Sequence, residues 1–160
     1  MIASGVTVVA AAGNGERFFP AMMPDVIAVG GVTVDEDDGL LAWDGASSFT
    51  SLIYSGRRVP DVCGIATRAQ LPTRAGTAVP GWVSADGATS LATAQVAGVA
   101  ALLIQKKPSL NPNEVREHLM HWATDVEQGK TASKNTATTG DDLATGAGLV
   151  NALKAWANLS

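Results

Sequence analysis

Two short and almost wholly apolar runs near the N-terminus are typical of strands that are buried on both faces. The first run covers residues 6–12 and ends at Gly13-Asn14-Gly15, and the second covers residues 26–34. Both contain β-branched residues, which favours strands of a mainly parallel sheet covered by helices. The segment between them is too short for a long crossover helix, so the two strands need not be direct neighbours. A further short strand is expected within residues 59–64.

A different pattern begins at Ser90, where Ala, Leu, Val and Ile continue with few polar residues as far as Gln105. Ala and Leu favour a helix, and a helix that is apolar on nearly all sides belongs in a protein interior. Thr89 or Ser90 is expected to cap its start. The cations at 106–107 and the proline at 108 mark its end.

Two more helices are expected towards the C-terminus. Residues 111–114, Asn-Pro-Asn-Glu, are a typical helix start and precede an apolar stripe over 115–122. Residues 149–159 indicate a final amphipathic helix, whereas 71–88 predict a loop or hairpin and 128–142 an exposed loop. Together the elements predict an α/β fold with three layers, α/β/α, around a mainly parallel sheet.

Composition is that of a globular domain. The chain has 160 residues, of which 46% are hydrophobic and 16% charged, and its formal net charge is −4. No basic patch is visible, so nucleic acid is not an expected partner. The longest apolar run, 96–104, is too short to span a membrane, and residues 1–4 do not resemble a secretory signal. The single cysteine, Cys63, is expected to be a buried structural thiol.

Two residues lie at positions where α/β proteins commonly bind ligands, the carboxyl end of a strand and the start of a helix. Asn14 follows the first strand, and ligands gather at the carboxyl ends of parallel strands, where an amide can donate to a developing negative charge. Ser90 opens the buried helix, whose first N–H groups are unpaired. Each has a plainer explanation when taken alone: serine commonly caps helices, and asparagine tolerates left-handed turns.

Taken together, several segments resemble the motifs of subtilisin-like serine peptidases, the subtilases, in the family's order. They are Val8-Val9-Ala10-Ala11-Ala12-Gly13-Asn14-Gly15, residues 19–30, Pro60-Asp61-Val62, residues 88–98 and residues 146–152. Residues 88–98, Ala-Thr-Ser-Leu-Ala-Thr-Ala-Gln-Val-Ala-Gly, resemble the nucleophile motif GTSMASPHVAG. The resemblance covers nearly the whole chain and implies a subtilisin-like fold.

The resemblance also implies roles for individual residues. Ser90 would attack the scissile carbonyl, and Asn14 and the backbone N–H of Ser90 would bind the oxyanion. Ala11, Ala12 and Gly13 would line one wall of the pocket for the residue before the cleaved bond, where small side chains leave room for a large apolar one. No cofactor is implied, and a structural calcium ion is possible without support from any carboxylate spacing. Most members of the family are secreted.

The chain departs from the motif at a few positions. Ala88 replaces a glycine two residues before the nucleophile, where it could crowd the backbone turn. Thr93, Ala94 and Gln95 replace Ser-Pro-His on the helix, one turn from the chemistry, where we expect tolerance. These changes bear on activity more than on fold.

The acid and base of the family's triad are missing from the expected place. In subtilases they precede the serine, whereas the only histidines here, His118 and His121, follow it. Their spacing on a helix would suit a metal, but no third ligand is evident, and solvated histidines are favoured. We therefore expect residues 1–160 to be the C-terminal part of a subtilase catalytic domain. Its expected partners are a polypeptide substrate and a complementary N-terminal part that carries Asp and His.

Three other functions are compatible with parts of the pattern. An α/β-hydrolase requires Gly-x-Ser-x-Gly around the nucleophile, which Ser90 does not have. A dinucleotide site requires a third glycine where Phe18 stands. The remaining alternative is a catalytically inactive subtilase-like chain that acts as a binding or assembly module.

Overall fold

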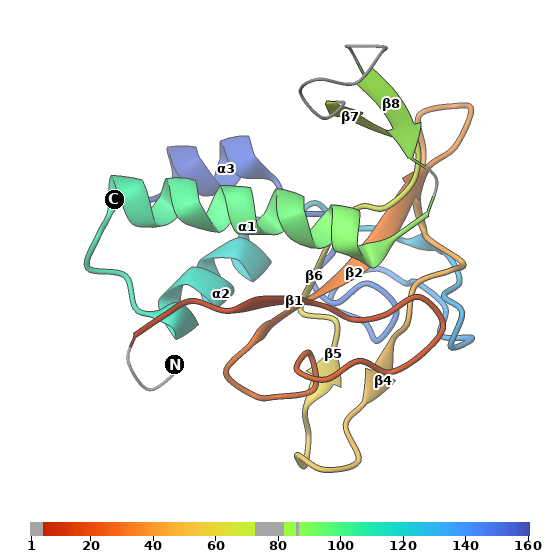
Figure 1. The fold of residues 1–160 in the computed structure, drawn as a ribbon, viewed down its shortest axis with the longest axis horizontal. Coiled ribbons are helices and arrows are strands. Elements are labelled where there is room, and N and C mark those ends of the chain that lie inside the picture. The colour runs from red at the N-terminus through yellow and green to blue at the C-terminus, as the bar shows by residue number, and fades with distance from the viewer. Residues whose placement is uncertain (1–4, 73–81, 86) are drawn as a thin grey trace.

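The computed structural model describes residues 5–72, 82–85 and 87–160 (Figure 1). Its elements, in chain order, are β1 (Val9–Ala11), β2 (Ile27–Val34), β3 (Leu40–Ala42), β4 (Phe49–Thr50), β5 (Arg58–Val59), β6 (Val62–Ile65), β7 (Ala69–Pro72), β8 (Trp82–Ala85), α1 (Thr89–Lys106), α2 (Pro112–His121), β9 (Gln128–Gly129) and α3 (Ala152–Ala157). Strands β1 to β8 precede the helices in the chain, and helices pack on a mixed sheet with mainly parallel pairs, which confirms the predicted α/β class.

The strand β2 is the centre of the main sheet. The first two strands are direct neighbours after all, since β1 pairs with β2 in parallel, with Val9 opposite Ile27. The antiparallel neighbour β3 follows beside the end of β2, with Val32 opposite Ala42. On the other edge of β2 lies β6, parallel, with Val29 opposite Val62. The loop between β1 and β2 therefore connects two adjacent parallel strands without a crossover helix.

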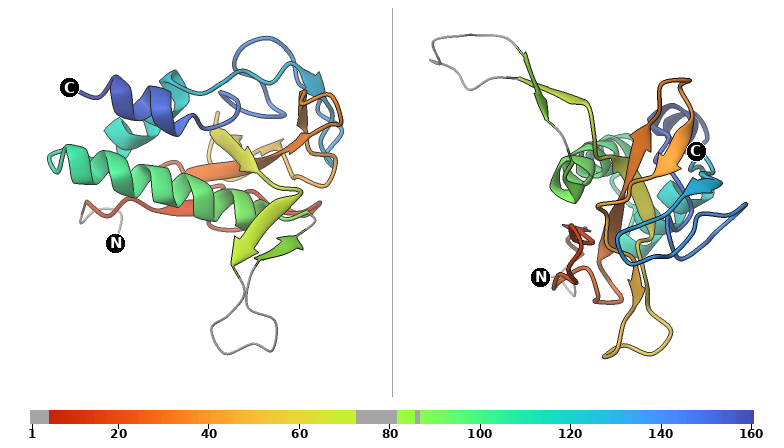
Figure 2. Two further views of the ribbon diagram at one scale, coloured as in Figure 1. Left: turned by 90° about the horizontal axis from the view of Figure 1, so that it is seen from above. Right: turned by 90° about the vertical axis from the view of Figure 1, so that its right-hand side faces the viewer.

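The long helix α1 packs along the strands with its buried residues towards them (Figures 1 and 2). The helix approaches the sheet closely at Gly64 of β6, because this residue has no side chain. A Cβ there would lie 2.6 Å from the carbonyl oxygen of Ala92 in α1. The shared core joins residues of the sheet to residues of all three helices: Ile27, Val29, Val62, Ala92, Val96, Ala100, Leu103, Val115, Leu119, Ala155 and Leu159. The first turn of α1 is thus held firmly against the sheet.

The helices α2 and α3 lie beside the C-terminal half of α1 (Figure 1). The predicted start of α2 is confirmed, because Asn111 accepts hydrogen bonds from the backbone and Glu114 completes a capping box. Helix α3 is shorter than the predicted 149–159, since residues 148–150 instead pair with Cys63 along the outer edge of β6. Cys63 is fully buried, as expected.

The segment 128–142 is less exposed than its polar composition predicts. Its first residues form β9, which pairs with β3, and Thr131, Ala137 and Asp142 are buried. Asp142 accepts hydrogen bonds from the backbone N–H groups of Thr138, Ala144 and Thr145, so local bonding satisfies a buried carboxylate. In the predicted loop or hairpin, β7 and β8 pair, while residues 73–81 lie outside the described part.

Within the described ranges, no helix has the length and apolar character needed to cross a bilayer.

Candidate functional site

The turn after β1 presents Asn14 at the carboxyl end of the sheet. The turn is held by Ser47, which is 1% exposed. The backbone N–H of Ser47 donates to the Gly13 carbonyl at 2.8 Å, its Oγ accepts from Gly15 N–H at 2.9 Å and donates to the Glu16 carbonyl. Nothing in the sequence pattern singles out Ser47, because it comes from a distant segment between β3 and β4.

Gly13 is required by this turn. Its φ is +123°, and a Cβ there would lie 2.7 Å from the Phe18 ring and 2.9 Å from Ser47 Oγ. The absence of a side chain thus allows the chain to reverse tightly and leaves Asn14 exposed.

The carboxamide of Asn14 is oriented by the start of α1. Its Oδ1 accepts hydrogen bonds from both the backbone N–H and the Oγ1 of Thr89, each at 2.8 Å. Because a backbone N–H can only donate, the atom facing it must be the oxygen, which fixes the amide assignment. The Nδ2 group is left on the other side of the carboxamide, and the described residues offer no recorded acceptor for it.

This contact corrects the expected helix cap. The N-cap residue of α1 is Ala88, which makes no side-chain cap bond, and Thr89 and Ser90 are the first helical residues. The distant Asn14 caps the helix in their place. Ser90 is exposed, and the described residues provide no recorded partner for its hydroxyl or its N–H. The plain capping role does not account for Ser90.

Asn14 and Ser90 line one hollow of about 310 Å³. Its lining residues are Ala10, Ala11, Asn14, Phe18, Phe19, Pro20, Thr89 and Ser90. Of the residues predicted to form a substrate wall, Ala11 is among them, whereas Ala12 and Gly13 are buried and are not. Phe18 and Phe19 were not predicted to contribute, although an aromatic pair directly after the Asn14 turn was a visible signal.

The electrostatics of this hollow favour binding of a developing anion. Asn14, which carries an amide N–H₂ group, and Ser90, at the start of a helix, both line it, and a helix N-terminus has unpaired N–H groups and the positive end of the helix dipole. A hydroxyl together with such donors is the combination of groups that acyl transfer uses. None of the residues that line the hollow is ionisable, so the described part supplies no base here.

The two histidines lie elsewhere. His118 and His121 line a different hollow together with residues of the C-terminus. His118 is not simply solvated as expected, since it is half-buried and its Nε2 lies 2.8 Å from the Ala155 carbonyl oxygen, which joins α2 to α3. Across the described ranges, no group of three or more His, Cys, Asp or Glu side chains is placed to hold a metal ion.

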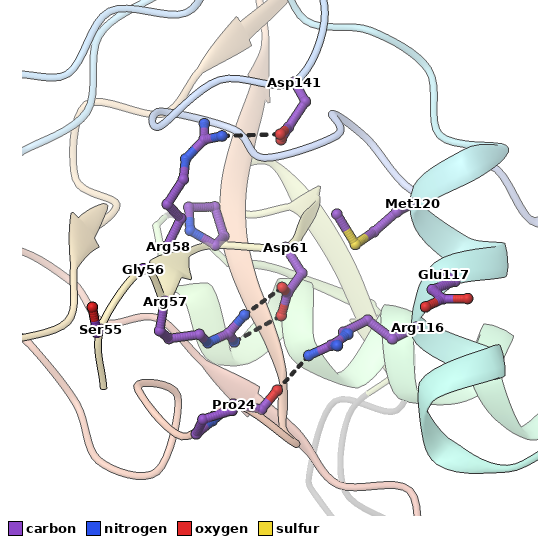
Figure 3. A pocket seen from close by; sticks show the side chains of 11 residues that line it. Pro24, Ser55, Gly56, Arg57, Arg58, Asp61, Arg116, Glu117, Met120 and Asp141 are labelled. Atoms are coloured by element: carbon purple, nitrogen blue, oxygen red, sulfur yellow. Dashed lines mark hydrogen bonds and ion pairs between the residues drawn. The ribbon is translucent and has the colours of Figure 1, made fainter. Parts of the chain in front are cut away.

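A larger hollow of about 500 Å³ lies between β5 and α2, and its arginines are already engaged (Figure 3). Arg57 forms an ion pair with Asp61 at 2.5 Å, and both side chains are more than 90% buried. Arg58 pairs with Asp141 at 3.0 Å, and Arg116 donates to the Pro24 carbonyl. Two of the three arginines are thus paired with carboxylates and the third with a backbone carbonyl, so this hollow has the character of a structural ion-pair region.

Cys63 is not a second nucleophile. Burial raises the pKa of its thiol far above the ordinary value, and the negative charge of Asp142 raises it further. A thiol kept protonated in this way is inert.

Comparison with known proteins decides the family. Residues 1–148 match the model of the subtilase family. The chain belongs to this family. Among curated subtilases, it is 35% identical to alkaline elastase YaB of Bacillus sp. (strain YaB) over 94% of this chain and 32% of that protein. It is 32% identical to subtilisin Savinase of Lederbergia lenta over 92% of this chain and 45% of that protein.

Solved subtilase structures agree with the sequence relatives. Sphericase superimposes with a TM-score of 0.76 at 25% identity, over 94% of this chain and 49% of that one. Fervidolysin from Fervidobacterium pennivorans, a keratinolytic enzyme related to subtilisin, superimposes with a TM-score of 0.69 at 23% identity, over 99% of this chain and 24% of that one. This subtilase chain therefore spans less than half the length of these relatives, within a family of serine endopeptidases.

Proposed function

We propose that the chain supplies the nucleophile and the oxyanion site of a serine endopeptidase. The observation that carries the proposal is the shared hollow of Asn14 and Ser90, with the carboxamide oxygen held by Thr89 so that its N–H₂ group remains available. Membership of the subtilase family supports the same chemistry.

In the proposed reaction, Ser90 Oγ attacks the scissile carbonyl carbon while a base takes its proton. The carbonyl oxygen becomes an oxyanion, which accepts hydrogen bonds from Asn14 Nδ2 and Ser90 N–H. Collapse of this intermediate expels the amine, which takes a proton from the same base, and leaves an acyl group on Ser90. Water then releases the acyl group by the reverse sequence. Since every step uses a hydroxyl, an amide and a base, no cofactor is proposed.

The base must come from outside the described residues, because none of those around Ser90 is ionisable. We propose a complementary part of the catalytic domain, which carries Asp and His. The relatives' greater length leaves room for such a part. Residues 1–160 are then the C-terminal part of one catalytic domain.

The exposed surface beside β1 supports this partner. β1 is the last strand on its side of the sheet and pairs only with β2 among the described strands, so its other edge is open. The adjacent helix α1 has a low polarity all round and still exposes a stripe of small or apolar residues: Ala94, Ala97, Gly98, Ala101 and Leu102. An added strand along β1 with a segment over this stripe would extend the sheet and cover the helix.

A fluorophosphonate probe tests the proposal, because it reacts only with an activated serine. We expect Ser90 to label in the assembly of both parts, and neither the chain alone nor the Ser90→Ala variant in that assembly to label. Absence of labelling in a verified assembly would favour the inactive binding module. Labelling of the chain alone would show that a base is present without the partner.

A further inference from the structure

Asn14 precedes a glycine, and this dipeptide is chemically labile. No other asparagine in the chain is followed by glycine. In an Asn-Gly dipeptide, the backbone nitrogen of the glycine can attack the carboxamide carbon of the asparagine, because glycine has no Cβ to hinder the approach. Asparagine is for this reason among the thermolabile residues of proteins. The amide that the proposed function uses as an oxyanion donor is thus also open to chemical loss.

Burial does not protect this dipeptide. Asn14 and Gly15 are both exposed, and Asn14 lines the hollow beside Ser90. Water can therefore reach the carboxamide, and ammonia can leave from it. Gly15 has a φ of +99°, and a Cβ at its position would meet no atom within 4 Å. The turn itself favours glycine, the residue that makes the dipeptide labile.

The nucleophile of this reaction is held by Ser47. The backbone N–H of Gly15 donates to Ser47 Oγ at 2.9 Å, so the nitrogen that would attack is engaged in a hydrogen bond. The N–H and the hydroxyl of Ser47 donate to the carbonyls of Gly13 and Glu16, which restrains the backbone on both sides of Asn14. Ser47 is 1% exposed, so the surrounding structure fixes its position.

The electrophile is held by the start of α1. Asn14 Oδ1 accepts two hydrogen bonds from Thr89, each at 2.8 Å, and the carboxamide cannot rotate without breaking them. Closure of a ring between Asn14 and Gly15 requires rotation of both the side chain and the backbone of Asn14. The contacts that restrain these rotations come from residues 75 and 32 positions away, so only the folded chain has them.

We propose that Asn14 is a deamidation site that the fold keeps latent, with Ser47 and Thr89 as the residues that restrain it. In the reaction, the Gly15 nitrogen loses its proton and bonds to Asn14 Cγ. The bond from Cγ to Nδ2 then breaks, and the amide group leaves with a proton as ammonia. Water opens the resulting succinimide at either carbonyl carbon, which leaves aspartate or isoaspartate at position 14. The consequence for activity rests on the proposed function, because a carboxylate cannot donate to an oxyanion.

The test measures deamidation at position 14 directly and needs no partner. The 160-residue chain, folded or unfolded in urea, is incubated in mildly alkaline buffer and digested, and the Asn, Asp and isoAsp forms of the peptide are quantified by chromatography with mass spectrometry. We expect slower deamidation in the folded chain. Ser47→Ala and Thr89→Val each remove a side-chain hydrogen bond to a reacting group, and each should raise the rate in the folded chain by about 2- to 13-fold.

Ser51→Ala is the matched control. Ser51 is also buried, and its Oγ accepts from the backbone N–H groups of Ile53 and Tyr54, which is the same kind of contact in a different turn. This variant should deamidate at the wild-type rate. Thr89→Val, which fills the same buried volume, keeps the test available if Ser47→Ala does not fold.

Three results would overturn the inference. They are equal rates in the folded and unfolded chain, a rate no higher than wild type in a folded Ser47→Ala or Thr89→Val variant, and an equal acceleration by Ser51→Ala.

A second measurement separates this inference from the proposed function. Samples deamidated to increasing extents are assembled with the complementary part and treated with the fluorophosphonate probe, and the labelling rate should fall in proportion to the loss of Asn14. The expected deamidation rates without loss of labelling would support the latent site and overturn the oxyanion role of Asn14. The expected rates with no labelling in any sample would overturn the proposed function alone.

Discussion

The Asn14 carboxamide has two roles that two substitutions can test separately. Its Oδ1 accepts hydrogen bonds from Thr89, and its Nδ2 is the proposed donor to the oxyanion. Asn14→Ala removes both hydrogen bonds to Thr89, which is 0% exposed in the folded chain. At about 0.5–1.5 kcal/mol for each bond, the loss is about 1–3 kcal/mol of unfolding free energy. For a chain of this size, the melting temperature should fall by about 2–12 °C.

Asn14→Asp has nearly the same shape and keeps an acceptor towards Thr89 N–H and Oγ1. A carboxylate at a helix N-terminus also gains about 0.3–1 kcal/mol from the dipole, so we expect wild-type stability or slightly more. The donor towards the oxyanion is lost, however, and a negative charge takes its place. In a subtilisin, loss of such a donor lowers kcat by about 10²–10³-fold. We expect at least this decrease in the reaction rate of Ser90 here, because the carboxylate also repels the oxyanion.

The assay is calorimetric unfolding of both variants, combined with the rate of fluorophosphonate labelling in the assembly. The expected pattern is a stable but inactive Asp variant and an unstable, inactive Ala variant. Equal destabilisation of the two would show that Oδ1 is not the atom facing Thr89. A stable Asp variant that labels at the wild-type rate would refute the donor role of Nδ2.

Other positions provide independent tests. Ser90→Ala should abolish labelling and change the unfolding free energy by less than about 0.5 kcal/mol in urea titrations, because the side chain is exposed. Arg57→Met should lower the unfolding free energy by about 3–5 kcal/mol, because it leaves the Asp61 carboxylate, which is 6% exposed, without its counterion. Adding Asp61→Asn should recover part of this loss in the same urea titrations. The raised pKa of the buried Cys63 thiol keeps it protonated when folded, whereas the unfolded thiol ionises above about pH 8.5. Its contribution to stability is therefore complete below that pH and falls by about 1.4 kcal/mol per pH unit above it; Cys63→Ala should remove this component of the pH dependence between pH 8 and 10.

The predicted elements depend on signals that are local in the chain. The apolar run that forms β2, the Asn111 capping box and the mainly apolar stretch of α1 each specify their structure through residues close together in the chain. The resemblance to the subtilase motifs predicts that Asn14 and Ser90 belong to one site, and the two residues do line one hollow. Their catalytic roles remain predictions.

The features that the sequence did not predict are contacts between distant segments. Asn14 and Thr89 are 75 residues apart, and Ser47 reaches the Asn14 turn across about 30 residues. A hydroxyl in a Ser-rich stretch carries no local sign of its partner, since serine serves equally well in turns and caps. The burial within 128–142 has the same cause, because β9 pairs with β3 and the hydroxyl of Thr131 hydrogen-bonds that of Ser48, 83 residues away.

The departures from the subtilase nucleophile motif have local structural explanations. Ala88 adopts an extended backbone, with φ −154° and ψ 135°, which any residue accepts, so the turn does not require a glycine there. The positive φ falls one residue earlier, at Gly87. Gln95 exchanges hydrogen bonds with the backbone N–H and carbonyl of Ile65, at 3.1 and 2.9 Å, and so ties α1 to the end of β6. Thr93 also donates to the carbonyl of Thr89, so two of the three altered helix residues form contacts that hold the N-terminal half of α1, the part of the helix that carries Ser90.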